Sequence, residues 1–139
     1  MLAFILLHLY VTRREYPQEL RLVLSATLVG LLVDNTLGYS GLVSYVGTPT
    51  IGYVPFWLIA IWSGFGATVR HSQALFFRSR WHAFLTGFLG GPLAYAGGVK
   101  LGCLEVQGAW GYILVGACWT FAMLGLFFQG GVRAPPRSA

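Results

Sequence analysis

Long apolar runs separated by short polar segments dominate the chain. The charge-poor runs cover residues 1–11, 22–37, 55–69, 81–99 and 109–128. A helix rises about 1.5 Å per residue, so about 20 apolar residues are needed to cross a bilayer. We therefore predict an all-α, polytopic transmembrane helix bundle in a single domain, 1–139. It would have four full spans at about 20–38, 55–77, 81–102 and 109–129, a short apolar segment at 1–11 and a tail at 130–139.

Two of these segments do not reach the required length by themselves. The third becomes long enough only if its helix continues through Arg70 and His71 to Phe77, where the apolar pattern resumes. The first run rises only about 16 Å, about half of a hydrocarbon core. It either forms a half-helix supported by its neighbours, or it belongs to a longer segment that starts upstream.

The positive charges alternate between the two sides of the predicted bundle. Eight of the nine Lys and Arg residues fall in 12–21, 70–80 and the tail, and only Lys100 falls on the other side. Because basic loops stay in the cytoplasm, we expect 38–54 and 103–108 outside and the C-terminus inside. A net charge of +5 also raises nucleic acid as a partner, but such binders cluster their basic residues on one soluble face, so we expect none.

Composition excludes a water-soluble monomer. Only 9% of the residues are charged, against roughly a quarter in soluble domains, and the mean hydropathy is +0.67. The uncharged outer segment 38–54 carries Tyr39, Tyr45 and Tyr53, which suits the membrane interface. We expect this segment either to lie flat over the bundle or to dip back into it.

Small residues recur at helical spacing in two of the expected spans. They are Gly87, Gly90, Gly91, Ala94, Gly98 and Gly102 in the fourth segment, and Ala60 and Gly64 in the third. Such rows let helix backbones approach closely, so we predict that these two helices pack together. The rows serve either internal packing or the docking of another subunit. Pro92 should interrupt the fourth helix and free the carbonyl of Phe88.

Ionisable groups inside apolar segments are the first candidates for a site. Asp34 lies about 21 Å along the second helix and Lys100 about 28 Å along the fourth, so both belong to the outer leaflet. We predict an Asp34–Lys100 pair, widened by Asn35. It is either a structural pair or a polar site for a head group, an ion or a proton.

The inner side offers weaker signals. Arg70 and His71 follow the third helix and His82 opens the fourth, so the two histidines are candidate ligands for a haem or another metal-centred pigment, against ordinary interfacial roles. His8 carries no specific signal. Glu19 is expected to be solvent-exposed on the basic loop.

No catalytic constellation stands at a useful spacing. The two cysteines, Cys103 and Cys118, lack the spacing of a metal site, and we expect them to be unpaired packing residues. The residues therefore predict no cofactor and no metal, and they favour a protein that is not an enzyme.

Three blocks carry a resemblance to a known family. They are residues 56–62, the stretch Gly90-Gly91-Pro92-Leu93-Ala94-Tyr95, and 98–102. The chain resembles an uncharacterised bacterial inner-membrane family, known only as a domain of unknown function, whose members are small multi-span proteins with a GGPL-x-Y motif. The resemblance implies a missing N-terminal segment, and an association with fatty-acid-modifying enzymes.

Three functions stay open. The first is a non-catalytic scaffold or accessory subunit of a larger membrane complex, docked through the glycine-rich helix faces. The second is a lipid- or fatty-acyl-handling protein, enzyme or carrier, with its site among Asp34, Lys100 and 38–54. The third is a small transporter, which would need a second copy to build a pathway.

Overall fold

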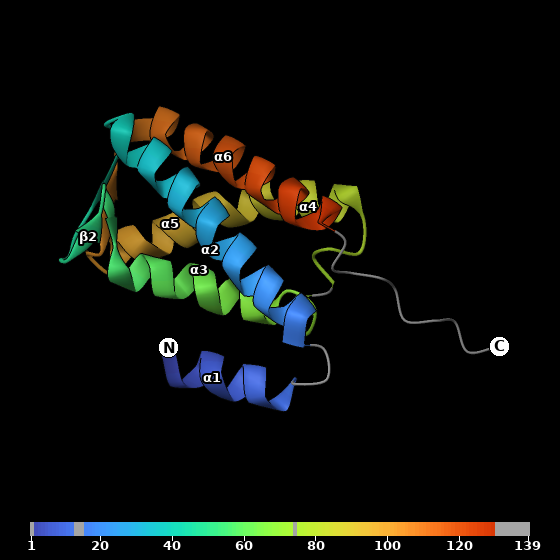
Figure 1. The fold of residues 1–139 in the computed structure, drawn as a ribbon. Helices are drawn as coiled ribbons and strands as arrows, with labels where there is room; N and C mark the ends of the chain where they lie inside the picture. Colours follow the sequence, from blue (N-terminus) through green and yellow to red (C-terminus); the bar gives the residue numbers. More distant parts are fainter. Residues whose placement is uncertain (1, 13–15, 74, 130–139) are drawn as a thin grey trace.

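The computed structural model describes residues 2–12, 16–73 and 75–129 and is mostly helical (Figure 1). The expectations for residue 1 and for the tail 130–139 lie outside the described residues. The helical elements are α1 (Leu2–Val11), α2 (Tyr16–Tyr39), α3 (Phe56–Thr68), α4 (Arg80–Leu85), η2 (Thr86–Gly90), α5 (Gly91–Lys100) and α6 (Gly108–Phe128).

Four full spans, as predicted from the sequence, are not supported. Within the described ranges, two helices are long and apolar enough to cross a membrane: α2, over Pro17–Tyr39, and α6. The third segment stops at Thr68, because the chain then folds into turns in which the N–H groups of His71 and Gln73 both donate to the Thr68 carbonyl. Helix α3 therefore has 13 residues and rises only about 20 Å.

The fourth segment is helical from Arg80 to Lys100 but is divided into three parts. Its N-cap is Ser79, whose side chain accepts a hydrogen bond from the His82 backbone N–H. The interruption predicted at Pro92 takes the form of a π-helical turn, η2, directly before α5. Proline has no N–H to donate to the preceding turn, and a π-helical turn is one way to accommodate that loss.

The helices pack in two pairs, and the pairing differs from the predicted one. Helix α3 packs on α2, where Gly30 leaves room for the ring of Trp62. The segment α4–η2–α5 packs on α6, since a Cβ at Gly87 would lie 2.5 Å from Thr120 and one at Gly91 2.6 Å from Trp119. Gly87 and Gly91 therefore face α6, whereas the sequence had suggested that the small residues of the fourth segment pack against α3.

The other residues of the small rows have different surroundings. Gly98 packs against Leu104, whereas Gly90, Ala94 and Gly102 are not covered by another helix. In α3, Gly64 is buried and Ala60 is half-buried.

Short strands close one end of the bundle, which the all-α prediction missed. Strand β1 (Val43–Tyr45) pairs antiparallel with β4 (Leu104–Val106), and β2 (Thr50–Ile51) pairs with β3 (Val54–Pro55). The predicted interfacial segment 38–54 is thus a strand cap that joins the loop before α3 to the loop before α6. We call this the strand end, and it lies opposite the turns that precede α4 (Figure 1).

The opposite end carries positive charge and is called the basic end here. Its described arginines are Arg21, Arg70, Arg78 and Arg80, where α2 starts, α3 finishes and α4 begins. Lys100, at the last residue of α5, belongs to the strand end. The alternation read from the loops is therefore kept by the described part of the fold.

Candidate functional site

Asp34 is the buried centre of the strand-end half. Its carboxylate accepts hydrogen bonds from the Trp62 indole Nε1 (2.7 Å), the Tyr45 hydroxyl (3.1 Å) and the Tyr95 hydroxyl. The side chain of Asp34 is fully buried. These bonds join α2 to α3, α5 and β1, so Asp34 ties four elements together and its two oxygens are satisfied.

The donors around Asp34 are neutral groups. Burial raises the pKa of the Tyr45 phenol above its ordinary value, so this hydroxyl keeps its proton and remains a donor. The two tyrosine hydroxyls are also 3.2 Å apart. This compact network leaves no exposed ligand atom, and it is best understood as structural.

The predicted Asp34–Lys100 pair is wrong. Lys100 is exposed at the end of α5, and it forms no ion pair with Asp34 in the described structure. The residue of α5 that does contact Asp34 is Tyr95, which lies more than one helical turn before Lys100. Asn35 supports the strand cap instead, because its Oδ1 accepts the Tyr53 backbone N–H at 2.9 Å.

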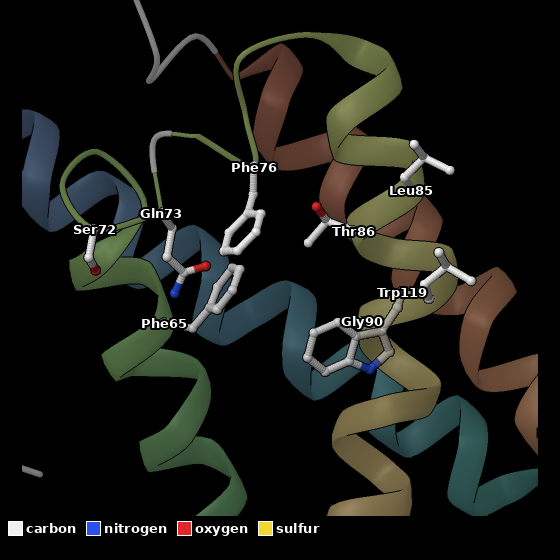
Figure 2. A pocket seen from close by; sticks show the side chains of 9 residues that line it. Phe65, Ser72, Gln73, Phe76, Leu85, Thr86, Gly90 and Trp119 are labelled. Carbon is white, nitrogen blue, oxygen red and sulfur yellow. The ribbon is translucent and has the colours of Figure 1, made fainter.

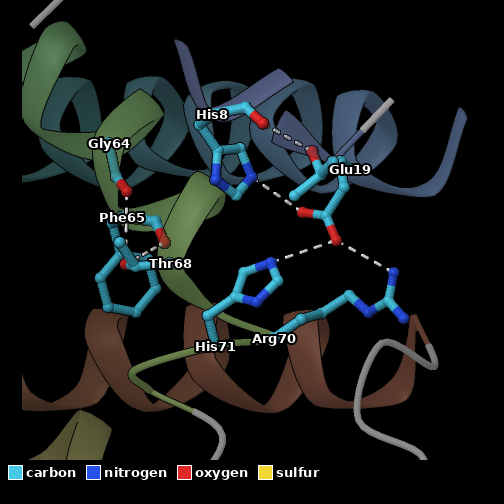
Figure 3. A network of polar contacts seen from close by, with 8 residues as sticks. His8, Glu19, Gly64, Phe65, Thr68, Arg70 and His71 are labelled. Atoms are coloured by element: carbon cyan, nitrogen blue, oxygen red, sulfur yellow. Dashed lines mark hydrogen bonds and ion pairs between the residues drawn. The ribbon is translucent and has the colours of Figure 1, made fainter. Parts of the chain in front are cut away.

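A second buried carboxylate, Glu19, lies at the basic end (Figure 3). Arg70 Nη1 lies 3.0 Å from one carboxylate oxygen, Oε1, and His8 Nε2 lies 3.0 Å from the other, Oε2. His71 Nε2 is 3.4 Å from Oε1. Only 1% of the Glu19 side chain is exposed, so the expectation of a solvent-exposed Glu19 is wrong.

The end of α3 explains this cluster. Because the helix stops at Thr68, Arg70 and His71 turn back toward the first turn of α2, while α1 brings His8. The sequence did hold a signal for it. Glu19 stands three, four and seven residues before Leu22, Val23 and Ala26, which are all buried, and therefore lies on the same helical face.

The histidine pair is different from the predicted one. The structure brings His71 together with His8, and their rings lie 5.2 Å apart between centroids. His82 instead bonds through Nδ1 to the Ser79 hydroxyl at 2.7 Å and is exposed on α4. Cys103 and Cys118 are both free, as expected.

A lateral pocket of about 650 Å³ opens between α3 and η2 (Figure 2). No sequence signal pointed to it. Of its polar groups, Ser72 and Gln73 lie at the turns after α3 and Thr86 lies across from them on η2 (Figure 2), and the rest of the wall is mostly aromatic or aliphatic. The full lining is Phe65, Ser72, Gln73, Phe76, Leu85, Thr86, Leu89, Gly90 and Trp119.

The pocket wall contains two unusual features. Trp119 carries a buried indole Nε1 with no hydrogen-bond partner in the described structure. Three of the lining residues, Thr86, Leu89 and Gly90, belong to the π-helical turn η2. Such turns are frequent at functional sites, and buried N–H groups are normally paired.

Together these features define a helical protein whose described residues include two candidate membrane spans, an open lateral pocket and two buried carboxylate clusters. The chain belongs to the family described as "Protein of unknown function (DUF2878)", whose profile matches residues 1–125. The resemblance to a family of unknown function is thereby confirmed. No curated protein and no solved structure shows significant similarity to the chain.

Proposed function

We propose that the protein is a multi-pass integral membrane protein of a bacterial inner membrane, with its basic end and C-terminus in the cytoplasm. The apolar length of α2 and α6 supports this proposal, and so do large apolar side chains that point outward along them, such as Leu32 and Phe121, which are 70% and 78% exposed. Lipid is the solvent that such surfaces require. The arginines at the basic end set the orientation.

Within that membrane, we propose that the protein binds a lipid with a fatty-acyl chain and does so without catalysis. The observation that carries this proposal is the lateral pocket between α3 and η2. Its volume lies in the range of small-molecule sites, roughly 300–1,000 Å³, and its wall is mostly apolar, with two adjacent polar residues, Ser72 and Gln73, beside α3 and Thr86 on η2. That division matches an amphiphile, whose chain and polar head need different surroundings.

The polar groups fix how such a lipid would lie. Its chain would contact Phe65, Leu89 and the Trp119 ring, and its ester or carboxyl oxygens would meet Ser72 and Gln73 at the turns after α3. This site lies toward the basic end, whereas the second of the three functions left open by the sequence had its lipid site among Asp34, Lys100 and 38–54.

Native mass spectrometry tests this function. The protein is extracted from native membranes into nanodiscs, and the retained lipid is compared between Leu89→Trp, which fills the pocket, and Leu93→Trp, which places the same ring on an exposed position of α5. We expect the unmodified protein and the control to retain one lipid species and Leu89→Trp to lose most of it, at least fivefold. The mass of the species separates a phospholipid from a free fatty acid.

Equal retention by both variants would show that the bound lipid does not occupy this pocket, and the lipid-binding proposal would fail. Loss in both variants, with monodisperse protein, would have the same meaning. Both side chains are more than half exposed, so neither variant is expected to prevent folding.

A second candidate function, the accessory subunit of a membrane complex, rests on one surface. Gly90, the last residue of η2, and Ala94 and Gly97 of α5 follow one another at spacings of four and three residues, and no other described helix covers them. A helix of another protein could approach this face closely. A stoichiometric larger complex in the same spectra, dissociated by Ala94→Leu, would favour this function.

A further inference from the structure

Three side chains with metal-ligand chemistry converge at the basic end (Figure 3). His8 comes from α1, Glu19 from α2, and His71 from the turn after α3. One ligand atom of each lies within 4.8 Å of the others. We propose that these three residues form a binding site for one divalent transition-metal ion of the Zn²⁺ type.

The spacing of the ligand atoms suits such an ion. With metal–ligand bonds of about 2.0–2.1 Å, two ligands of a tetrahedral zinc stand roughly 3.4 Å apart. Glu19 Oε2 lies 3.0 Å from His8 Nε2, and one ligand atom of His71 lies within 4.8 Å of both other ligands. Small side-chain adjustments are enough to place a metal ion between them.

Two of the three ligands are buried, and the third is open to solvent. Glu19 is 1% exposed and His8 is 11% exposed, so two ligands are held by packed helices. His71 is 48% exposed and opens the site to solvent. Two histidines and one carboxylate leave a fourth position for water, as in zinc sites with an open coordination position.

The neighbouring Arg70 sets how Glu19 would bind. The Arg70 guanidinium holds Oε1 at 3.0 Å, so Oε2 is the oxygen that faces His8 and would take the metal. Each histidine would coordinate through neutral Nε2, with its proton on Nδ1, so that binding replaces the present hydrogen bond to Glu19. The positive charge of Arg70 lowers the affinity for a cation, and we therefore expect micromolar and not nanomolar binding.

The ligand set also determines which ions bind. Imidazole nitrogens favour Zn²⁺, Co²⁺ and Ni²⁺, whereas Mg²⁺ and Ca²⁺ prefer oxygen ligands. The bound ion would connect α1, α2 and the turn after α3. It would therefore fix the short helix α1 against the rest of the bundle.

The test is a metal titration of the full chain in detergent, purified without a polyhistidine tag and treated with a chelator. Zn²⁺ binding is measured by competition with a chromogenic chelator, and Co²⁺ binding by its visible absorption. We expect one equivalent per chain and at least a tenfold weaker binding for His8→Ala and for His71→Gln. His82→Ala is the matched control, because His82 is an exposed histidine outside the cluster, and its binding should be unchanged.

Several results would overturn the site. They are a chain that binds no Zn²⁺, equal binding by the His71→Gln variant, or a loss confined to His82→Ala. A half-exposed His71 can be replaced without disturbing the packed core, so a folding defect does not obscure that variant. Saturation by Mg²⁺ at the same concentrations as Zn²⁺ would also reject the proposed ligand set.

Discussion

Helix α2 carries a buried carboxylate near each end, and the two are satisfied in opposite ways. Asp34 is surrounded by neutral donors, from Trp62, Tyr45 and Tyr95, on elements that pack tightly around it. Glu19 is surrounded by an arginine and a histidine from the turn after α3 and by a second histidine from α1.

The difference separates a structural half from the half where we propose ligand binding. Neutral donors occupy both oxygens of Asp34, and Asp34 does not line the lateral pocket. Imidazoles offer lone pairs to a metal, and the basic end also holds the lateral pocket with its unpartnered Trp119 N–H. Predicted function therefore concentrates at the basic end.

The largest effect should follow the loss of the Asp34 carboxylate. Asp34→Ala removes the shared acceptor of three donors, and because the two tyrosine hydroxyls can still bond each other, two donors are left unsatisfied. Each unsatisfied donor costs about 1–3 kcal/mol, so we expect a loss of about 4 kcal/mol in the free energy of unfolding. Lys100→Met is the control and should change it by less than about 0.5 kcal/mol, because Lys100 is exposed. Reversible unfolding in mixed micelles measures both. Equal losses for the two variants would instead support the predicted Asp34–Lys100 pair.

A smaller loss should follow the change of Glu19. Glu19→Gln keeps the shape but removes the charge that Arg70 and His8 contact, and we expect a loss of about 2 kcal/mol, since these partners are partly exposed. Cleavage within α1 by a protease should accelerate, because His8 then loses its carboxylate partner. The exposed neighbour Gln18→Ala serves as the control. If Glu19→Gln costs more than Asp34→Ala, the assignment of the structural half is reversed.

The sequence predicted the helices better than their ends and partners. Apolar runs located α2, the fourth segment and α6, because burial and lipid exposure both need apolar side chains. They could not reveal that α3 stops at Thr68. That end depends on the turns that follow it, whose residues contact the Thr68 carbonyl and also Glu19, which is distant in the chain. Strands of two or three residues were missed because their pairing joins 43–45 to 104–106.

The candidate residues show the same limit. Asp34 was selected as an ionisable group in an apolar segment, and Arg70 and His71 as groups that follow the third helix, but their partners came from other elements. Lys100 was chosen for Asp34 because opposite charges attract, whereas a fully buried carboxylate is also satisfied by hydroxyl and indole donors. No sequence signal pointed to the pocket, because it forms between α3 and η2, which belong to different helix pairs.

The smallest effect concerns the glycines of the fourth segment, which differ between the two halves. Gly87, toward the basic end, touches the backbone of Thr120, so Gly87→Ala forces two helices apart and should cost about 1–2 kcal/mol. Gly97, near the strand end, has nothing within 4 Å of its would-be Cβ, so Gly97→Ala should stabilise the helix by about 0.5 kcal/mol. The same unfolding measurement in micelles, with lipid removed, compares the two. Destabilisation by Gly97→Ala would mean that a partner or a second copy covers this face in solution, and that the open row on α5 is an interface.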